Sequence, residues 1–467
     1  MAAVSASSTE RTPPARRRGE PRVERSLFLV LEGGRVAAGG LRIALVGAGV
    51  LRIGRGDVRT LPTGAGVRQL AIPDARMSAI HARIVATGAG HVLEDAGSTN
   101  GTLVNGAPIT RHVLRDDDVV ELGQTLFVYR ARSEDSAAPA PDLDSSALTG
   151  QPPAFATLDP ALERRLQRLA RVAPSSLSIL LLGETGTGKE LLAQGLHALS
   201  RRPGPFVAVN CGAIPDTLIE SHLFGHVRGA FSGALRDEPG LVRSAQHGTL
   251  LLDEIGDLPA SSQAALLRVL QESEVRPVGS AHTTKVDVRI IAATHMPLEA
   301  LIARDAFRRD LYARLIGYTF TIPPLRERRV DLGLLVAALL AAGKLGASRD
   351  LRIHNDAARM LVHHAWPMNV RELEQVLRAA ALLADDATIT AHDLPPSLVD
   401  LDADPGFPDD RAVPVVLPPG PAQQRARLLA LIAEHDGNLS AVARVLATSR
   451  SQLHRLLERH AIEPRSP

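Results

Sequence analysis

The chain has 467 residues, enough for about three domains of ordinary size, and its 45% hydrophobic content excludes a disordered polymer. Its longest apolar stretch, Leu332 to Gly343, is shorter than the ~20 residues that cross a bilayer, and the single cysteine, Cys211, excludes an internal disulfide. The net charge of +2 does not exclude a nucleic-acid partner, because positive charge can still gather in one part of the chain. We expect a cytoplasmic protein with no membrane partner.

Two stretches lose their hydrophobic pattern and fill with Pro, Ser and Asp, which is typical of linkers. They separate three blocks of different character. The predicted division is a disordered tail at 1–25, a first domain at 26–132, a linker at 133–155, a second domain at 156–398, a linker at 399–420 and a third domain at 421–467.

The first domain contains short apolar runs separated by Gly, Asp and Asn turns, such as Leu27–Leu31 and Thr125–Tyr129. It lacks long helical periodicity. This pattern predicts an all-β sandwich.

Polar and glycine-rich segments within this sandwich follow the order Ile53-Gly54-Arg55, Ser78 to His81 and Gly97 to Thr102. In this order and spacing, 26–132 resembles a forkhead-associated (FHA) domain. The resemblance implies a phosphothreonine-peptide site, with a phosphothreonine-containing protein or a Ser/Thr kinase as partner. A sandwich without a binding site is the alternative. The expected peptide contacts are Arg55, Ser78, Thr99 and Asn100.

The second domain alternates buried strand runs, such as Ser178–Leu182 and Thr249–Leu252, with helical segments such as Glu190–Leu199. This alternation predicts a parallel α/β sheet. A glycine-rich loop follows the first of these strands and opens a helix, where backbone N–H groups and the helix dipole favour a phosphate. The expected nucleotide contacts are Gly183, Glu184, Thr185, Gly186, Thr187, Gly188, Lys189 and Glu190.

Two acids, Asp253 and Glu254, end the strand at Leu250–Leu252. The carboxyl edge of a parallel sheet places them toward the phosphate loop. We expect Asp253 to act through Mg²⁺ and Glu254 to orient and deprotonate the attacking water, because phosphoryl transfer depends on positioning and charge compensation. The alternative is a solvated pair of acids.

The ordered motifs GETGTGKELLAQGLH, GAFSGA, GTLLLDEIGDLP, FRRDLYARL and WPMNVREL make 156–398 resemble the AAA+ domain of sigma-54-dependent activators, the bacterial enhancer-binding proteins. The resemblance implies a helical lid and a homo-oligomer, hexameric when active and dimeric when inactive, with ATP between subunits. Arg308 and Arg314 match the family's arginine fingers. Thr294 and Arg371 match its two nucleotide sensors, and Asn210 matches the residue that restrains the catalytic glutamate.

The GAFSGA segment predicts a flexible glycine-flanked turn with an aromatic tip. In the family this loop contacts sigma-54, so sigma-54 RNA polymerase is the implied partner. Burial of Phe231 in a core is the alternative. The loop residues are Gly229, Ala230, Phe231, Ser232, Gly233 and Ala234.

The third domain predicts an all-α helix-turn-helix, with a last helix that begins at Arg450. The block resembles the Fis-type domain of the same activators, and its last 47 residues carry seven arginines against four acids. A solvated amphipathic hairpin is the alternative. The expected contacts to upstream, enhancer-like DNA sites are Arg450, Ser451, Gln452, His454 and Arg455.

Together these features predict a transcriptional activator that hydrolyses ATP to remodel the sigma-54 polymerase closed complex and is gated by phosphothreonine recognition. One alternative is a phosphothreonine-binding, DNA-associated scaffold or repressor that does not engage sigma-54. Ser232, which stands where the family usually has Thr, is the residue that raises this alternative. A general AAA+ remodeller of other clients is a further alternative, which the loop and the DNA-binding tail disfavour.

Overall fold

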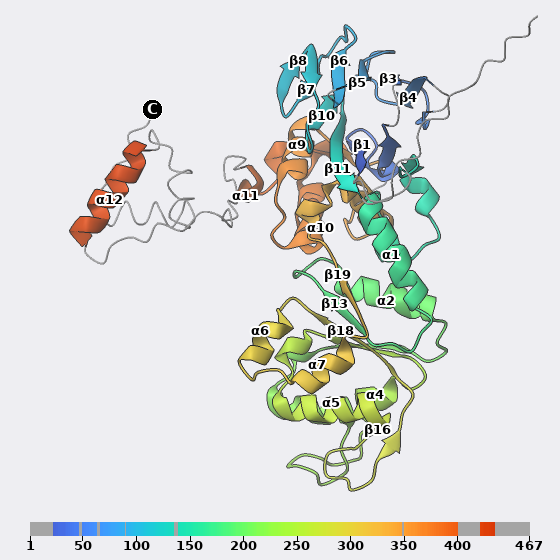
Figure 1. Ribbon diagram of the computed structural model, residues 1–467, viewed down its shortest axis with the longest axis vertical. Coiled ribbons are helices and arrows are strands. Elements are labelled where there is room, and N and C mark those ends of the chain that lie inside the picture. The colour runs from blue at the N-terminus through green and yellow to red at the C-terminus, as the bar shows by residue number, and fades with distance from the viewer. Residues whose placement is uncertain are drawn as a thin grey trace, which may run out of the picture.

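The computed structural model describes residues 22–45, 49–62, 66–88, 90–134, 139–347, 350–399 and 421–434. It contains a β-sandwich, a central α/β domain and a helical lid that lies between them (Figure 1).

The sandwich consists of two sheets whose inner faces form one core. Leu27 and Leu29 of one sheet pack with Leu51 and Ile53 of the other, and all four are buried. The predicted all-β sandwich is confirmed. The first sheet has the order β12-β2-β1-β11-β10-β7-β8 and the second the order β4-β3-β5-β6-β9. The strands are β1 (Arg22–Glu32), β2 (Leu41–Ala44), β3 (Val50–Arg55), β4 (Val67–Ile72), β5 (Ala82–Thr87), β6 (Gly90–Asp95), β7 (Thr102–Val104), β8 (Ala107–Ile109), β9 (Arg111–Val113), β10 (Val119–Leu122), β11 (Thr125–Glu134) and β12 (Leu143–Asp144).

The stretch 139–155, which we expected to be linker, is folded onto the sandwich. β12 pairs with β2, and the short 3-10 turns Ser145–Leu148 and Pro153–Phe155 follow it. Its acids are paired, Asp142 with Arg68 and Asp144 with Arg59. Ion pairs and sheet pairing therefore order a segment whose composition is typical of linkers.

The central domain is a five-stranded parallel sheet of order β14-β15-β18-β13-β19, which confirms the predicted α/β class. Successive side chains of β15 alternate between two cores, with Leu250 and Leu252 on one face and Leu251 on the other. Helices cover both faces, so the strand is apolar throughout. The strands are β13 (Ile179–Leu182), β14 (Phe206–Asn210), β15 (Thr249–Asp253), β18 (Arg289–Thr294) and β19 (Tyr318–Thr321), with a small hairpin of β16 (Glu274–Val275) and β17 (Thr284–Lys285). The helices are α1 (Pro160–Val172), α2 (Lys189–Ser200), α3 (Asp216–Phe224), α4 (Gly240–Ser244), α5 (Ala260–Glu272), α6 (Leu298–Ala303) and α7 (Arg309–Leu315).

The lid follows the sheet through two 3-10 turns at 325–331 and packs around Trp366, which is fully buried. Its elements are α8 (Leu332–Ala341), β20 (Arg352–Ile353), α9 (Asn355–His363), α10 (Asn369–Leu383), β21 (Thr388–Ile389) and α11 (Pro396–Val399).

Beyond the lid, the described chain resumes only as α12 (Pro421–Glu434). The predicted helix-turn-helix and its five expected DNA contacts at 450–455 lie outside the described residues. In the described part of the chain, no helix has the length and apolar character needed to cross a bilayer.

Candidate functional site

The glycine-rich loop joins β13 to α2 and turns through backbone conformations that favour glycine, with φ of 79° at Gly186 and 97° at Gly188. Lys189, the first residue of α2, is 7% exposed. Its Nζ donates to the carbonyl of Gly183 at 3.0 Å and lies 3.5 Å from Oε1 of Glu254. The loop thus holds a buried cation beside a helix N-terminus.

Asp253 and Glu254 lie at the carboxyl end of β15, facing this loop. Burial, with the Glu254 charge beside it, raises the pKa of Asp253 above its usual range. Burial also opposes ionisation of Glu254, but the hydrogen bond from His295 and the Lys189 ammonium outweigh it and lower the pKa of this carboxyl. The two neighbouring acids therefore have pKa values shifted in opposite directions.

His295, which directly follows the neighbouring strand β18, contacts the carboxylate of Glu254. Nδ1 of His295 lies 2.8 Å from Oε2 of Glu254, and the backbone N–H of His295 donates to the same oxygen at 3.2 Å. Asn210 pairs with Asp253 across the sheet, but its Oδ1 accepts from Gly212 N at 3.0 Å. Glu254 thus contacts His295 and Lys189, and the sequence did not indicate this position for His295.

Thr294 ends β18 next to the phosphate loop. Its carbonyl accepts from Gly183 N at 3.3 Å, and its buried Oγ1 accepts from Met296 N at 3.0 Å. Glu190 points to solvent and accepts from Gln194 at 3.3 Å. Thr294 therefore lies at the end of the strand beside the phosphate loop.

The lid lies directly on the phosphate loop. Val370 N donates to Gly186 O at 3.0 Å, and a Cβ on Gly186 would overlap the Met368 carbonyl and come within 3.0 Å of Cβ of Arg371. The fully buried Asn369 donates to the Thr185 carbonyl and to Glu184, each at 3.1 Å. Arg371 is thereby brought to the loop.

Two residues that the sequence did not point to, Arg326 and Arg328, also hold the phosphate loop. Arg326 donates to both carboxylate oxygens of Glu184, at 2.8 and 2.6 Å, and this bidentate hydrogen bond lowers the pKa of Glu184. Arg328 donates to the Thr187 carbonyl at 3.1 Å. These contacts could not be predicted from the sequence of the phosphate loop, because both arginines lie far from it along the chain and reach it only in the folded structure.

These residues fit a nucleoside triphosphate with Mg²⁺. The position of a Cβ on Gly188, at the N-terminus of α2, is open space, and backbone N–H groups there suit phosphate oxygens. The described residues contain no cluster of three or more His, Cys, Asp or Glu that would hold a metal alone. Mg²⁺ commonly rests on one or two carboxylates plus water and phosphate oxygens, so a site with the single carboxylate of Asp253 is compatible with this ion.

Arg308 and Arg314 lie at the start and end of α7, and both are exposed. The guanidinium of Arg308, the residue that precedes α7, pairs with Asp310 in the first turn of that helix at 2.7 and 3.0 Å. Both side chains are therefore accessible at the surface of the chain.

The GAFSGA segment forms a closed turn at the surface, where Gly229 N donates to Ala234 O at 2.8 Å. Phe231 at its tip is 39% exposed and lies against the His226 ring, with centroids 4.9 Å apart. Ser232 is exposed as well. Leu235, which sequence reasoning did not single out, follows the turn and is 85% exposed.

The four expected peptide contacts of the sandwich come from neighbouring loops. Arg55 N donates to Ser78 O at 2.9 Å, and Thr99 N donates to Ser78 Oγ at 3.1 Å. Asn100 Nδ2 donates to the Arg76 carbonyl at 2.8 Å. Arg55, Thr99 and Asn100 are exposed and Ser78 is half-buried, so the loops form one polar surface.

Two residues brace these loops. The buried His81 accepts from Ser78 N at 3.2 Å and lies 3.0 Å from Gly101 O. Asp95 accepts from Ser98 and Thr102 hydroxyls, each at 2.6 Å. Partial burial opposes ionisation of Asp95, but these bonds and two backbone hydrogen bonds outweigh it and lower the pKa of Asp95 to about 2.

Comparison with family models gives three matches along the chain. Residues 155–321 match the sigma-54 interaction domain, 326–406 match an AAA+ ATPase lid domain, and 51–123 match the FHA domain.

Two curated relatives and one solved structure illustrate the similarity. The acetoin catabolism regulatory protein of Cupriavidus necator is 47% identical over 67% of this chain, which spans about half (48%) of that protein. The transcriptional regulatory protein GlrR of Escherichia coli is 37% identical over 76% of this chain and 80% of its own length. The crystal structure of NtrX from Brucella abortus in complex with ATP is 34% identical, covering 65% of this chain and 69% of that one with a TM-score of 0.49. The family-model matches and the similarity to GlrR show that the chain belongs to the family of sigma-54-dependent transcriptional activators, with a central AAA+ ATPase domain and an FHA domain before it.

Proposed function

We propose that this protein hydrolyses ATP to remodel the sigma-54 RNA polymerase closed complex. The observation that carries the proposal is the exposed Phe231 on its closed glycine turn, in the same domain as Lys189 and the acids Asp253 and Glu254. A nucleotide-driven change in the domain would move this aromatic tip against a partner.

In this proposal the phosphate loop and Lys189 bind the triphosphate, and Asp253 holds Mg²⁺. Mg²⁺ supplies charge compensation for the phosphate oxygens. Glu254, kept ionised by its hydrogen bond from His295, orients the attacking water and takes its proton. Arg308 and Arg314 complete the site of an adjacent protomer, so activity requires a ring, with a dimer as the inactive state.

The FHA surface at Arg55, Ser78, Thr99 and Asn100 would bind a phosphothreonine presented by a partner or by the substrate of a Ser/Thr kinase. Arg55 supplies a charge-assisted bond to the phosphoryl oxygens, and the other three orient the peptide. The helix-turn-helix expected at 421–467 would place the ring at upstream DNA sites through Arg450, Ser451, Gln452, His454 and Arg455.

The deciding experiment measures conversion of closed to open promoter complexes by the full chain with sigma-54 RNA polymerase and ATP. We expect Phe231→Ala to abolish open complexes while ATP hydrolysis continues. The matched control is Leu382→Ala, which removes a 75% exposed apolar side chain from α10 and should change neither activity. If the wild-type chain hydrolyses ATP without opening promoters, the scaffold or repressor function takes its place.

A further inference from the structure

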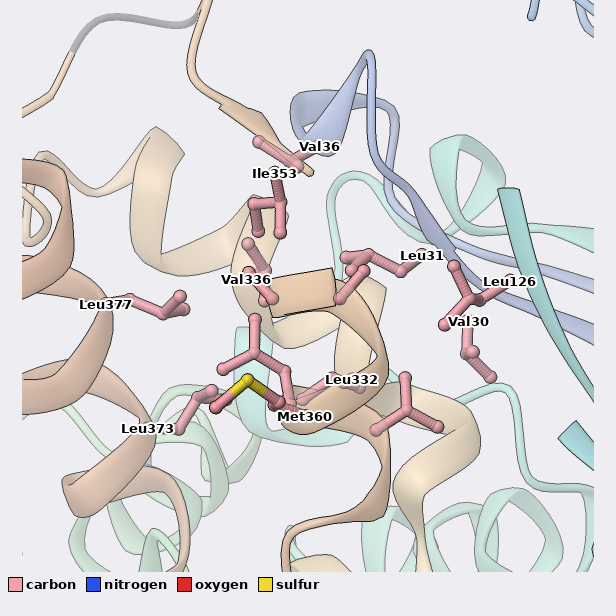
Figure 2. Packing of buried hydrophobic residues seen from close by; sticks show 14 of the residues in the cluster. Val30, Leu31, Val36, Leu126, Leu332, Val336, Ile353, Met360, Leu373 and Leu377 are labelled. Carbon is pink, nitrogen blue, oxygen red and sulfur yellow. The ribbon is translucent and has the colours of Figure 1, made fainter. Parts of the chain in front are cut away.

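The outer face of one FHA sheet and the helical lid share a single hydrophobic core (Figure 2). On β1 and β11, the side chains that point away from the sandwich, such as Val30 and Leu126, are fully buried. They pack in one cluster with Leu332 and Val336 of α8. Domains joined by a linker usually meet over small and more polar interfaces. Separating this pair would expose a continuous apolar core to water.

The backbones of the two parts also touch. A Cβ on Gly333, at the start of α8, would overlap the carbonyl of Val30. On the other side of the contact, Ile353 N of β20 donates to Gly33 O at 2.8 Å, and Asn355 Nδ2 donates to Gly123 O at 2.6 Å. These two bonds, one between backbone groups and one from a side-chain amide to a backbone carbonyl, fix the position of one part against the other.

Opposite charges meet at the edge of the contact. Glu121 of the FHA domain, only 1% exposed, pairs with Arg359 of α9 at 2.8 Å. Asp117 pairs with Arg329 in the segment that leads from the ATPase sheet to the lid. Breaking either pair would leave a charged side chain without its partner, which is costly where the charge is buried.

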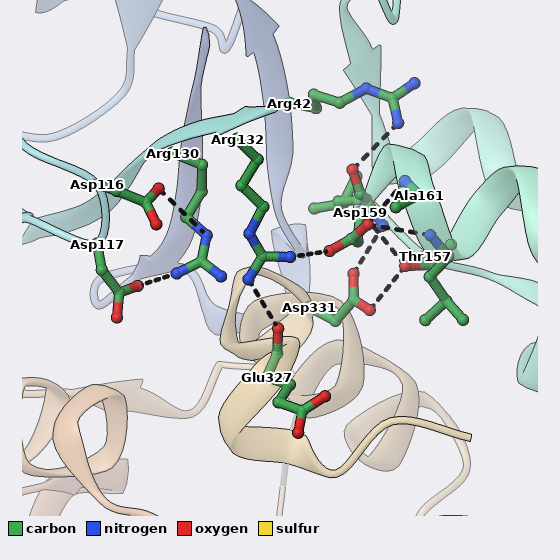
Figure 3. A network of polar contacts seen from close by, with 12 residues as sticks. Arg42, Asp116, Asp117, Arg130, Arg132, Thr157, Asp159, Ala161, Glu327 and Asp331 are labelled. Atoms are coloured by element: carbon green, nitrogen blue, oxygen red, sulfur yellow. Dashed lines mark hydrogen bonds and ion pairs between the residues drawn. The ribbon is translucent and has the colours of Figure 1, made fainter. Parts of the chain in front are cut away.

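Figure 3 shows a second polar network on the same side of the sandwich. Arg132 of β11 reaches Asp159 at 3.4 Å and the Glu327 carbonyl at 3.5 Å. The buried Asp331 accepts from Thr157 Oγ1 at 2.7 Å and from Leu158 N at 2.6 Å. Polar contacts at this network therefore connect the FHA domain, the start of the ATPase domain and the segment that leads to the lid.

The junction touches both candidate sites. Asp74, in the loop that leads to Ser78, accepts from Gln124 N at 2.6 Å in the turn that contacts the lid. On the nucleotide side, Arg329 and Arg328 are consecutive, and they contact Asp117 of the FHA domain and the Thr187 carbonyl of the phosphate loop, respectively. The junction thus contacts the FHA domain beside the loop that carries Ser78, and it also contacts the phosphate loop through Arg328.

We propose that the FHA domain and the lid form one rigid unit that stays together while the ATPase works. A signal at the peptide surface would then reach the nucleotide site through this junction and not by detachment of the FHA domain. The rigid unit does not depend on the proposed function, whereas the route of the signal rests on it.

The first test is hydrogen exchange of the full chain carrying Val336→Ala, which makes a cavity on the lid side of the shared core. We expect amides of β1 and β11 to exchange about tenfold faster, because opening of the lid also opens the FHA sheet. The matched control is Val242→Ala, an equally buried valine of the ATPase core, which should leave β1 and β11 unchanged. Faster exchange confined to the lid in Val336→Ala would overturn the proposal.

The second test joins the two parts covalently. Asp117→Cys with Arg329→Cys removes both members of their ion pair, whose side chains are 33% and 22% exposed, and a short bismaleimide then links the two cysteines. The native Cys211 should not compete, because it is 2% exposed and burial raises the pKa of its thiol to about 12. We expect the linked chain to hydrolyse ATP within about twofold of the unlinked double variant.

A loss of more than about tenfold on linking, restored with a cleavable linker after cleavage, would show that the FHA domain must detach and would overturn the proposal. If the unlinked double variant and the wild type both fail to hydrolyse ATP, the proposed function fails. The exchange result still decides whether the rigid unit exists.

Discussion

The imidazole of His295 hydrogen-bonds the carboxylate of Glu254, with Nδ1 2.8 Å from Oε2. Glu254 has a left-handed backbone, with φ of 50°, and its other carboxylate oxygen lies 3.5 Å from Lys189 Nζ. Bound phosphates would compete for Lys189, and His295 would then be the remaining partner that orients Glu254. Its contact comes from a neighbouring strand, so only the fold brings the two together.

We therefore expect His295→Ala to lower kcat for ATP hydrolysis about tenfold, because a general base works only when oriented toward the proton that it takes. KM for ATP should change less than about threefold, since among the described residues the polar contacts of His295 go to Glu254 and not to the phosphate loop. His295→Asn, which keeps a short donor, should recover most of the rate, and His222→Ala at an exposed position serves as control. A raised KM with an unchanged kcat would contradict this role.

Asn369 offers a test of the lid contact with the phosphate loop. Its side chain accepts from Leu325 N at 2.8 Å and donates to Glu184 and Thr185, and its φ is 55°. Asn369→Ala loses these bonds and adds backbone strain, so we expect the Kd of ATP to rise about tenfold, corresponding to roughly 1.4 kcal/mol. Asn369→Gly loses the bonds but relieves the strain, and isothermal titration should place it between wild type and Ala. Equal affinity of all three chains would show that the lid contact does not support nucleotide binding.

Much of the fold follows from hydrophobic pattern. The run Leu27–Leu31 predicts a strand, and the strand is there. The run is unbroken because Leu27 and Leu29 face the sandwich core while Phe28 and Val30 face the lid. An unbroken run indicates burial on both faces, but it does not say which element covers the second face.

In the candidate site, too, some residues could be predicted from the sequence and others could not. Lys189, Asp253 and Glu254 could be predicted because they end or begin elements of a parallel sheet. Arg326 and His295 could not, because their contacts to Glu184 and Glu254 depend on how the lid and β18 are placed. The linker prediction at 133–155 followed composition, whereas paired Asp142 and Asp144 fold part of that stretch.

The shared core predicts a large effect for a very small substitution. Gly333→Ala adds one methyl group that would overlap the Val30 carbonyl, so α8 and β1 must move apart. We expect a loss of about 1–3 kcal/mol in the free energy of unfolding, measured by urea titration of the transition that includes the FHA domain. Gly88→Ala, where an added Cβ meets nothing within 4 Å, should stay within about 0.5 kcal/mol of wild type. Similar stability of the two variants would argue against close backbone contact.

His91 gives the sandwich a defined dependence on pH. It is 6% exposed, its Nδ1 lies 3.1 Å from Tyr129 Oη, and burial, aided by Arg25, lowers its pKa from 6.5 to about 4. The folded state thus favours neutral imidazole. The resulting stability is fully present above pH 6.5 and is lost as the pH falls toward 4.

Between pH 7 and pH 5 we expect this histidine to cost the FHA domain roughly 1–2 kcal/mol. His91→Gln keeps a polar partner for Tyr129 but does not titrate, so its unfolding midpoint should depend less on pH than that of the wild type. His222→Gln at an exposed site should keep the wild-type dependence. The measurement is thermal unfolding at several pH values between 4 and 7, followed through a signal of the FHA domain. If wild type and His91→Gln lose stability in parallel, protonation elsewhere governs acid unfolding, and the buried imidazole is not the group responsible.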